Sequence, residues 1–475
     1  MLWSLVLSPF ALAALAAVAP GAGRRRPLLL LAGALLHAGG VAWIWIAPPE
    51  PTRWLAADPL GKIVLTTAST LFLACAIYAQ GYLRRREDRD DRVFVAGLLA
   101  FLGAMTLAAL AQHLGLLWIA IEATTLASAP LVYFEHDARS LEATWKYLLI
   151  CSVGIALALL GTFLIALAAT NGEPPVRSLM LADLRAGAAG LSPPWLEAAF
   201  VFILVGYGTK MGLAPLHSWK PDAYGEAPAV VGALLSGALT NCAFLGILRP
   251  LGILRAAGHA GFALEALVVM GLFSMALAAV FVVGQRDFKR MLAYSSVEQM
   301  GVLAFGVGIG GPALAFAMFH IVNNGLAKGV LFLSAGNIHR SFGSKRIEVV
   351  RGAARRLPLS GPLFLLGFFA VTGSPPFGPF FSEFGILNGA FGAGRFLAGG
   401  LFLGLLAIVF IGMSVTVLHV VQGDPEGAPE IAGMGDSWLT AAPPLFLLVA
   451  VAWLGLFLPG PIHRLFLSAA TALGG

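Results

Sequence analysis

Charged residues and long polar stretches are scarce in this chain. Of its 475 residues, only 11% are Asp, Glu, Lys or Arg, whereas 59% are hydrophobic. Because soluble domains carry about 25% charged residues, the composition excludes an ordinary soluble fold. It predicts instead a multi-pass membrane protein with no separate soluble domain.

Cysteine is also rare. Cys75, Cys151 and Cys242 stand singly in apolar segments and form no CxxC pair. This spacing gives no support for an iron–sulfur cluster, a haem attachment or a zinc site, and it indicates small buried side chains. We therefore expect no metal, no other cofactor, no catalytic residue and no redox centre within the chain.

The positive charges form no basic face, although the net charge is +6. A nucleic-acid surface would need a basic patch in polar surroundings, whereas these residues stand in short loops between apolar segments. Arg24, Arg25 and Arg26 follow the first apolar stretch. A signal peptide carries its charge before that stretch, so we expect a retained first helix with its N-terminus outside.

Fourteen apolar segments approach the ~20 residues that a helix needs to cross a bilayer. Because backbone groups must be satisfied within the membrane, they predict an all-α polytopic bundle of about 14 transmembrane helices. The predicted spans are 3–21, 27–47, 61–83, 93–111, 114–134, 146–170, 195–214, 228–248, 262–284, 292–310, 312–335, 357–391 (broken), 396–420 and 438–459.

Loop charges agree with this topology. If the spans alternate in direction, twenty Lys and Arg residues fall on one side and eight on the other, which leaves only Lys210 and Lys328 within spans. The more positive side is normally cytoplasmic. We therefore expect a multi-pass protein of the bacterial cytoplasmic (inner) membrane, with both termini in the periplasm.

Two apolar segments contain helix breakers, 208–219 (GTKMGLAPLHSW) and 372–387 (TGSPPFGPFFSEFGIL). Proline removes a helical hydrogen bond and clashes with the preceding turn, so both segments predict discontinuous helices. Such a pair favours two inverted repeats around a conducting site, with two unrelated proline kinks as the alternative. The predicted division is N-terminal transmembrane helices in 1–92, five-helix repeats in 93–248 and 262–420, and a C-terminal transmembrane helix in 421–475.

Four charged residues lie deep inside predicted spans, namely Lys210, Lys328, Glu122 and Glu383. A charge at the bilayer centre costs at least ~2.5–3.5 kcal/mol, so such residues normally mark ion or proton paths. Glu122 is either hydrogen-bonded to Thr125 or paired with a lysine of another helix. The presence of buried lysines favours the pair.

Three further charged residues lie nearer to helix ends. Glu265 and Glu298 can reach headgroups or water from there, and the role of Glu298 is left open. Lys146 can likewise extend to the cytoplasmic surface, which we favour over a relay role.

His320, Asn324 and Lys328 are spaced i, i+4 and i+8 in one predicted span. This spacing places them on one helix face, over about 12 Å. Histidine titrates near neutrality and a buried lysine can release its proton, so the stripe is typical of proton conduction. Polar contacts between helices are the alternative, and for Asn324 alone we favour that alternative.

Five motifs together resemble one known family. They are KMGLAPLHSWKPDAYGEAP, VGALLSGALTN, DFKRMLAYSSVEQMG, FHIVNNGLAKGVLFLSAG and PPFGPFFSEFGIL. Over roughly residues 60–420 they resemble the proton-conducting antiporter-like family of complex I subunits, Mrp antiporter subunits and energy-converting hydrogenase subunits. Within it, WIAIEATTLASAPLVYF and LEATWKYLLICSVGIALALLG are most similar to hydrogenase-4 component F.

The resemblance implies a proton relay. Glu122 matches the family's glutamate that partners a lysine, here Lys210. Lys328 matches the central lysine of the second half, and His320 matches a histidine near it. Glu383 matches the charged residue of the second broken helix, at the expected exit towards the periplasm.

Two positions depart from the family pattern. Asn241 stands where a lysine or histidine is common, and Asn324 stands where a second histidine is common. Both asparagine side chains are polar but cannot bind or release a proton, so they are expected only to support the relay. Water would have to bridge the path at these points, or the path runs elsewhere.

The implied function is proton translocation by a membrane subunit of a redox-driven complex. Its expected partners are other membrane subunits and a soluble hydrogenase or formate-oxidising arm, because the chain has no redox centre of its own. One alternative is a sodium/proton antiporter subunit of the Mrp type, since the coupled ion is left open between protons and sodium. Others are a membrane partner of an inorganic-carbon-capturing zinc enzyme and a structural anchor.

Overall fold

The computed structural model describes residues 1–18, 25–84, 90–425, 427, 431 and 433–474. Its helices are α1 (Leu2–Val18), α2 (Arg25–Ile46), α3 (Pro59–Leu83), α4 (Arg92–Leu110), α5 (Leu114–Val132), α6 (Ala138–Thr170), α7 (Leu181–Ala186), α8 (Pro193–Met211), α9 (Trp219–Glu226), α10 (Ala229–Leu234), α11 (Thr240–Ala256), α12 (Ala260–Val282), α13 (Phe288–Ile309), α14 (Pro312–Phe342), α15 (Ala353–Arg356), α16 (Ser360–Val371), α17 (Gly378–Gly392), α18 (Phe396–Val421), α19 (Trp438–Leu456) and α20 (Gly460–Ala472). Short turns are η1 (Tyr133–Glu135), η2 (Ala188–Gly190) and the π-helical η3 (Leu235–Leu239).

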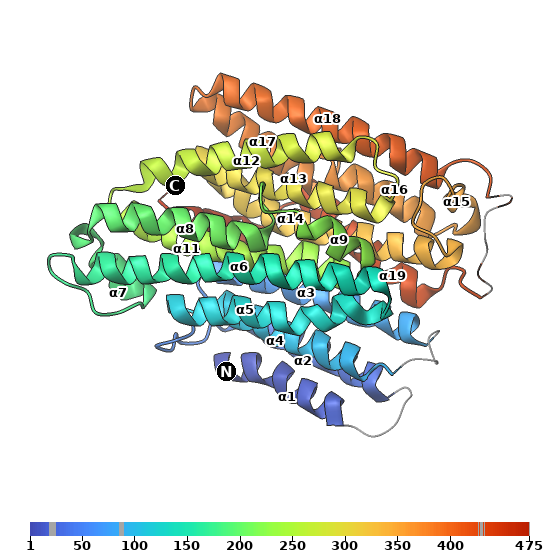
Figure 1. Ribbon diagram of the computed structural model, residues 1–475, viewed down its shortest axis with the longest axis horizontal. Coiled ribbons are helices and arrows are strands. Elements are labelled where there is room, and N and C mark those ends of the chain that lie inside the picture. The colour runs from blue at the N-terminus through green and yellow to red at the C-terminus, as the bar shows by residue number, and fades with distance from the viewer. Residues whose placement is uncertain (19–24, 85–89, 426, 428–430, 432, 475) are drawn as a thin grey trace.

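The long helices lie side by side, with α1 and α2 at one edge and α17 and α18 at the other (Figure 1). Eleven helices of the described chain are long and apolar enough to cross a membrane, and α1 and α16 are shorter apolar helices. The all-α, multi-pass fold is therefore confirmed. The count of fourteen spans stays a prediction.

Both predicted helix breaks are present. The first lies between α8 and α9, where Gly212 has φ +85° and ends α8. The second lies between α16, which ends at Val371, and α17, which begins at Gly378. The inverted repeats and the segment boundaries drawn from these breaks stay predictions.

One irregularity was not predicted. The segment 228–248 holds the π-helical turn η3 between α10 and α11. Single π-turns are rare and occur often at functional sites. Here the turn lies against α14 at Gly237, where an added Cβ would lie 2.5 Å from the carbonyl oxygen of Gly325. A side chain at Gly237 would therefore separate the two helices.

Small residues bring α6 and α8 together. A Cβ added to Gly206 of α8 would lie 2.5 Å from the backbone nitrogen of Ala158 of α6. Small residues allow such close helix packing inside a membrane. The approach places Tyr147 of α6 beside the last turn of α8, where Lys210 lies.

The core lies around α10–α11, α13 and α14, whose apolar windows are 89–100% buried. By contrast, only about a third of the residues in the windows of α2 and α18 are buried. The exposed residues on these outer helices are mostly apolar, which suits contact with lipid tails.

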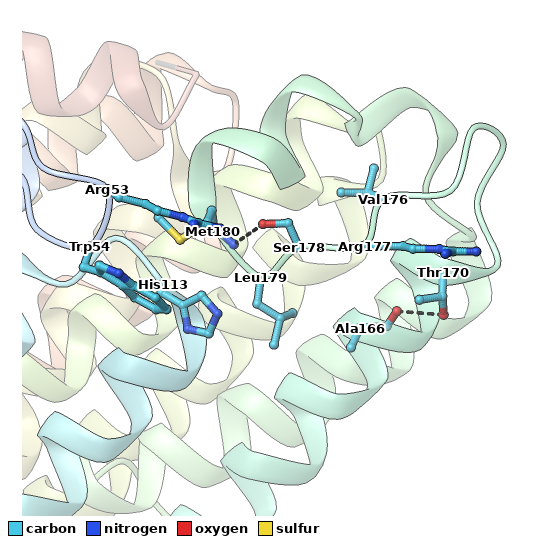
Figure 2. A pocket seen from close by; sticks show the side chains of 10 residues that line it. All are labelled: Arg53, Trp54, His113, Ala166, Thr170, Val176, Arg177, Ser178, Leu179 and Met180. Carbon is cyan, nitrogen blue, oxygen red and sulfur yellow. Dashed lines mark hydrogen bonds between the residues drawn. The ribbon is translucent and has the colours of Figure 1, made fainter.

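Loops assigned to one side of the membrane do lie together. Arg53 and Arg177 of the less positive side line a pocket of about 440 Å³, which Figure 2 shows with the two arginines on either side. Thr170, the last residue of α6, lines the same pocket. Arg139, at the other end of α6, lines a second pocket of about 630 Å³ together with Lys345. The loop residues Arg24, Arg85, Arg86 and Arg89 lie outside the described residues.

Candidate functional site

The first buried centre is formed by Lys210 in the last turn of α8. Its side chain is fully buried, and Nζ donates to Thr125 Oγ1 of α5 at 2.9 Å and to the Tyr147 hydroxyl of α6 at 2.6 Å. The Thr125 hydroxyl donates in turn to Glu122 Oε2 at 3.2 Å. The hydrogen bond between Thr125 and Glu122, which was the alternative to a glutamate–lysine pair, is therefore present, and Glu122 reaches Lys210 only through Thr125 in the described chain.

Tyr147 is a component of this centre that the sequence did not reveal. Its hydroxyl also lies 2.6 Å from Ser128 Oγ, and Lys210 Nζ is 4.4 Å from the centre of its ring. The only signal in the sequence was its position directly after Lys146, where the long apolar part of the helix begins. That position did not distinguish a buried tyrosine from one that faces lipid.

The second buried centre surrounds Lys328 of α14. This lysine is fully buried, and Nζ donates to Ser295 Oγ of α13 at 2.7 Å. The carboxyl groups of Glu298 and Glu383 are close enough to interact with it electrostatically. Lys328 therefore donates to a hydroxyl, as Lys210 does, and has carboxylates nearby.

Glu298 lies in this centre and not at a surface. It is 2% exposed, so the expectation that it reaches headgroups or water is wrong. The side-chain amide of Gln299 donates to Glu298 Oε2 at 2.8 Å and to Glu383 Oε1 at 3.3 Å. The Gln299 amide thus links the carboxyl group of Glu298 on α13 to that of Glu383 on α17. Glu298 lies one turn after Ser295, so both residues face Lys328 from α13.

The predicted polar stripe on α14 is completely buried. His320, Asn324 and Lys328 are each 0% exposed, and His320 Nδ1 lies 2.9 Å from Ser382 Oγ of α17. Among the described residues, His320 Nε2 and the side-chain amides of Asn323 and Asn324 have no protein partner. Buried polar atoms of this kind normally bind ordered water. Within the described chain, the side chain of Asn324 forms no hydrogen bond that would link two helices.

Asn241 of α11, by contrast, does link two helices. Its amide nitrogen donates to the carbonyl of Gly237 at 2.9 Å and to that of Ile321 in α14 at 3.4 Å. Its carbonyl oxygen is buried without a partner in the described chain.

The two other lysines of interest lie in different environments. Lys220 and Arg249, which the topology assigned to loops, are fully buried in α9 and α11, so the prediction that Lys210 and Lys328 are the only Lys and Arg residues within the bundle is wrong. Lys146 is 44% exposed and forms ion pairs with Glu142 and Asp222. This is the surface position that the sequence favoured for Lys146.

Glu383 also reaches the wall of a pocket. The pocket has a volume of about 340 Å³, lies between α17 and α18, and includes Phe384 and Ile411, which are 59% and 61% exposed. The second centre therefore lies close to the outer surface of the bundle. In the described chain, no three His, Cys, Asp or Glu side chains are grouped as metal ligands.

These observations define a class: a multi-pass helical membrane protein with two buried lysine centres, each beside a carboxyl group and a broken helix. The sequence model described as "NADH:quinone oxidoreductase/Mrp antiporter, TM" matches residues 111–411. The chain belongs to this family of antiporter-like membrane subunits.

Individual relatives agree with this assignment. The chain is 36% identical to the hydrogenase-4 component F homolog of Methylacidiphilum infernorum, over 82% of this chain and 83% of the relative. It is 32% identical to NADH-quinone oxidoreductase subunit N of Desulforudis audaxviator, over 86% of this chain and 79% of that relative. A chain of an archaeal respiratory membrane complex, the membrane-bound sulfane sulfur reductase, has the same fold, with a TM-score of 0.87. The two chains are 21% identical, and the match covers 99% of this chain and 97% of that chain.

Proposed function

We propose that this chain translocates protons as a membrane subunit of a redox-driven complex of the hydrogenase or complex I type. The observation that carries the proposal is that Lys210 and Lys328 are both completely buried and donate to hydroxyls. Burial favours the neutral amine, whereas a nearby carboxylate favours the charged form. Each lysine can therefore bind or release a proton when a carboxylate moves.

The first centre is where a partner can act. Glu122 is only partly buried, and it reaches Lys210 through the hydroxyl of Thr125. A shift of α5 that carries Glu122 and Thr125 away from Lys210 would weaken the support for a charged Lys210 and release its proton. A neighbouring subunit that touches α5 is positioned to cause such a shift.

The second centre is the proposed exit. A proton that reaches Lys328 meets Glu298 and Glu383, and Glu383 lines the pocket between α17 and α18. His320 and the unpaired amides of α14 would hold water on this side of the path. The chain is proposed to lie in the bacterial cytoplasmic membrane with both termini in the periplasm.

Moving one proton against 100 mV requires about 2.3 kcal/mol, so a partner must supply the energy. The names of the two relatives, a hydrogenase component and an NADH-quinone oxidoreductase subunit, support a redox-driven complex. We place the redox chemistry in a soluble hydrogenase or formate-oxidising arm.

The test begins with isolation of the native complex through a tag on this chain and identification of its subunits by mass spectrometry. Hydrogenase or formate-oxidising subunits support the proposal. Small Mrp subunits, with sodium-dependent proton exchange in the absence of an electron donor, would replace it by the antiporter function. A soluble zinc enzyme as the main partner would indicate inorganic-carbon capture.

The second step measures proton translocation by the reconstituted complex during turnover of its electron donor. We expect Lys210→Met and Lys328→Met to abolish translocation. Lys62→Met is the matched control, because Lys62 of α3 contacts the Trp45 ring and neither buried centre. Normal translocation by both of the first two variants would refute the function.

A further inference from the structure

Lys220 is buried between the two centres, in the first turn of α9. Its Nζ donates to Ser296 Oγ of α13 at 3.1 Å and lies 5.8 Å from the centre of the Tyr224 ring. Its aliphatic carbons pack against Gly212, at the end of α8. Lys220 is 0% exposed, and within the described chain its amine donates only to this hydroxyl, so its burial is costly.

One side of Lys220 faces the Lys210 centre. The preceding residue, Trp219, has its ring 5.0 Å from that of Tyr147, and Lys210 Nζ lies 6.0 Å from the centre of the Trp219 ring. Lys220 also packs against Gly212, which lies two residues after Lys210. The two amines therefore border the same small region between α6, α8 and α9.

The other side of Lys220 faces the Lys328 centre. Lys220 donates to Ser296, and Lys328 donates to Ser295, which is the adjacent residue of α13. The two lysines also interact electrostatically. Two hydroxyls on consecutive residues thus separate the two amines.

We propose that Lys220 is the amine that carries protons between the Lys210 and Lys328 centres. This inference rests on the proposed function, because it completes the same path. Neutral Lys220 accepts a proton released from Lys210 and becomes an ammonium. It then passes one proton to neutral Lys328 along the serine hydroxyls or bound water, so that each step moves one proton and no electrons.

Electrostatic repulsion gives this step its direction. A proton on Lys220 disfavours a proton on Lys328, since like charges at close range destabilise each other. Release from Lys328 towards Glu298 and Glu383 therefore allows Lys220 to pass on its proton. Asn241, which cannot titrate, serves instead as the link between α11 and α14.

Ion pairs hold α9 in place. Asp222, two residues after Lys220, accepts from Lys146 of α6 at 2.9 Å and from Arg290 of α13. These contacts fix α9 between the two helices that line the path. The ion pairs of Asp222 thus hold the helix that carries Lys220, and Ser296 holds the Lys220 amine.

The test compares Lys220→Met and Lys220→Arg in the reconstituted complex, with Lys62→Met as the matched control. Arginine keeps the charge and the donor and does not deprotonate in proteins. A positioned proton-transfer group contributes about 10²–10⁴-fold, so we expect both Lys220 variants to lose at least ~10-fold in translocation. Assembly and electron transfer of the complex should be retained.

The outcomes separate a relay from a structural lysine. Normal translocation by Lys220→Met would overturn the inference, because the amine would not be needed. Normal translocation by Lys220→Arg with impaired Lys220→Met would also overturn it, because a fixed charge would then suffice and no titrating amine would be required. If those variants do not assemble, Lys220→His decides. An imidazole titrates nearer neutrality, so a relay predicts an optimum of translocation at lower pH, whereas an unchanged pH profile contradicts it.

Failure of this inference is distinguishable from failure of the proposed function. Loss of translocation in Lys210→Met and Lys328→Met with normal Lys220→Met leaves the function standing and removes the relay. Normal translocation in all three variants removes both.

Discussion

The amine of Lys210 lies 2.6 Å from the hydroxyl of Tyr147. This hydroxyl also contacts Ser128, so it joins α5, α6 and α8 at one point. A tyrosine hydroxyl can both donate and accept. Tyr147 can therefore stay hydrogen-bonded whether Lys210 is an ammonium or a neutral amine, which suits a residue that changes its charge.

Removing this hydroxyl should slow proton transfer. Tyr147→Phe deletes one acceptor of Lys210, and a lost hydrogen bond of about 1 kcal/mol corresponds to about a fivefold lower rate. Translocation by the reconstituted complex is the measurement. Tyr207→Phe is the control, because Tyr207 is also buried and its hydroxyl bonds to Thr162 of α6. Equal effects of the two changes would argue against a role for Tyr147 in the path.

Gly212→Ala should displace Lys220. Gly212 has φ +85°, and an added Cβ would overlap the Lys220 side chain. The control is Gly258→Ala, with φ +81° and no atom within 4 Å of an added Cβ. Left-handed backbone costs a non-glycine residue about 1–2 kcal/mol, so both variants should lose stability in thermal unfolding, and Gly212→Ala should lose more because its methyl group also overlaps Lys220.

Only Gly212→Ala should also impair translocation, because only there does the new methyl group meet the proposed relay lysine. Translocation is compared at equal amounts of assembled complex. Similar translocation by the two variants would show that the position of Lys220 does not matter.

The fold was largely predictable because its signals are local. Apolar length gave the spans, and Pro and Gly residues gave the breaks at 208–219 and 372–387. The buried stripe from His320 to Lys328 followed from helical spacing.

The partners of the lysines were not predictable, since they come from other helices. Thr125 and Ser295 are ordinary helix residues in the sequence, and only packing shows that they accept from lysines. Lys220 was misplaced because its neighbours Pro221 and Asp222 are typical of loops. In the structure this polar segment is instead the short buried helix α9.

Arg249 should be a major determinant of stability. Its fully buried guanidinium donates to the carbonyls of Ala108, Ala109 and Ala111 at the end of α4, and to Asp58 at the start of α3. The last carbonyls of a helix lack partners within the helix, so this side chain satisfies them.

Arg249→Met should therefore lower the free energy of unfolding by about 3–5 kcal/mol, the usual cost of breaking a buried charged network. Arg286→Met is the comparison, since Arg286 is 78% exposed and a surface change normally stays within about 0.5 kcal/mol. Denaturant titration in detergent measures both. A loss for Arg249→Met no larger than that for Arg286→Met would contradict this role.

Asp137 should make the start of α6 sensitive to pH. Its carboxylate accepts from the backbone N–H of Ser140 at 2.7 Å, and the Ser140 side chain bonds back to Asp137. These hydrogen bonds, the backbone one first, hold the pKa of Asp137 below its ordinary value. A lowered pKa contributes stability above the unfolded pKa of about 3.9, and this contribution disappears as pH falls through the folded value.

Asparagine caps a helix about as well as aspartate and does not titrate. In Asp137→Asn, the first turn of α6 should therefore keep most of its protection against amide exchange, and this protection should no longer decline at low pH. Asp137→Ala should lower the stability of this turn by about 0.5–2 kcal/mol at neutral pH. Amide exchange at residues 140–143, compared between wild type and variants at matched pH from 6 down to 3, is the measurement. If wild type and Asp137→Asn lose protection in parallel as pH falls, a carboxylate other than Asp137 controls this turn.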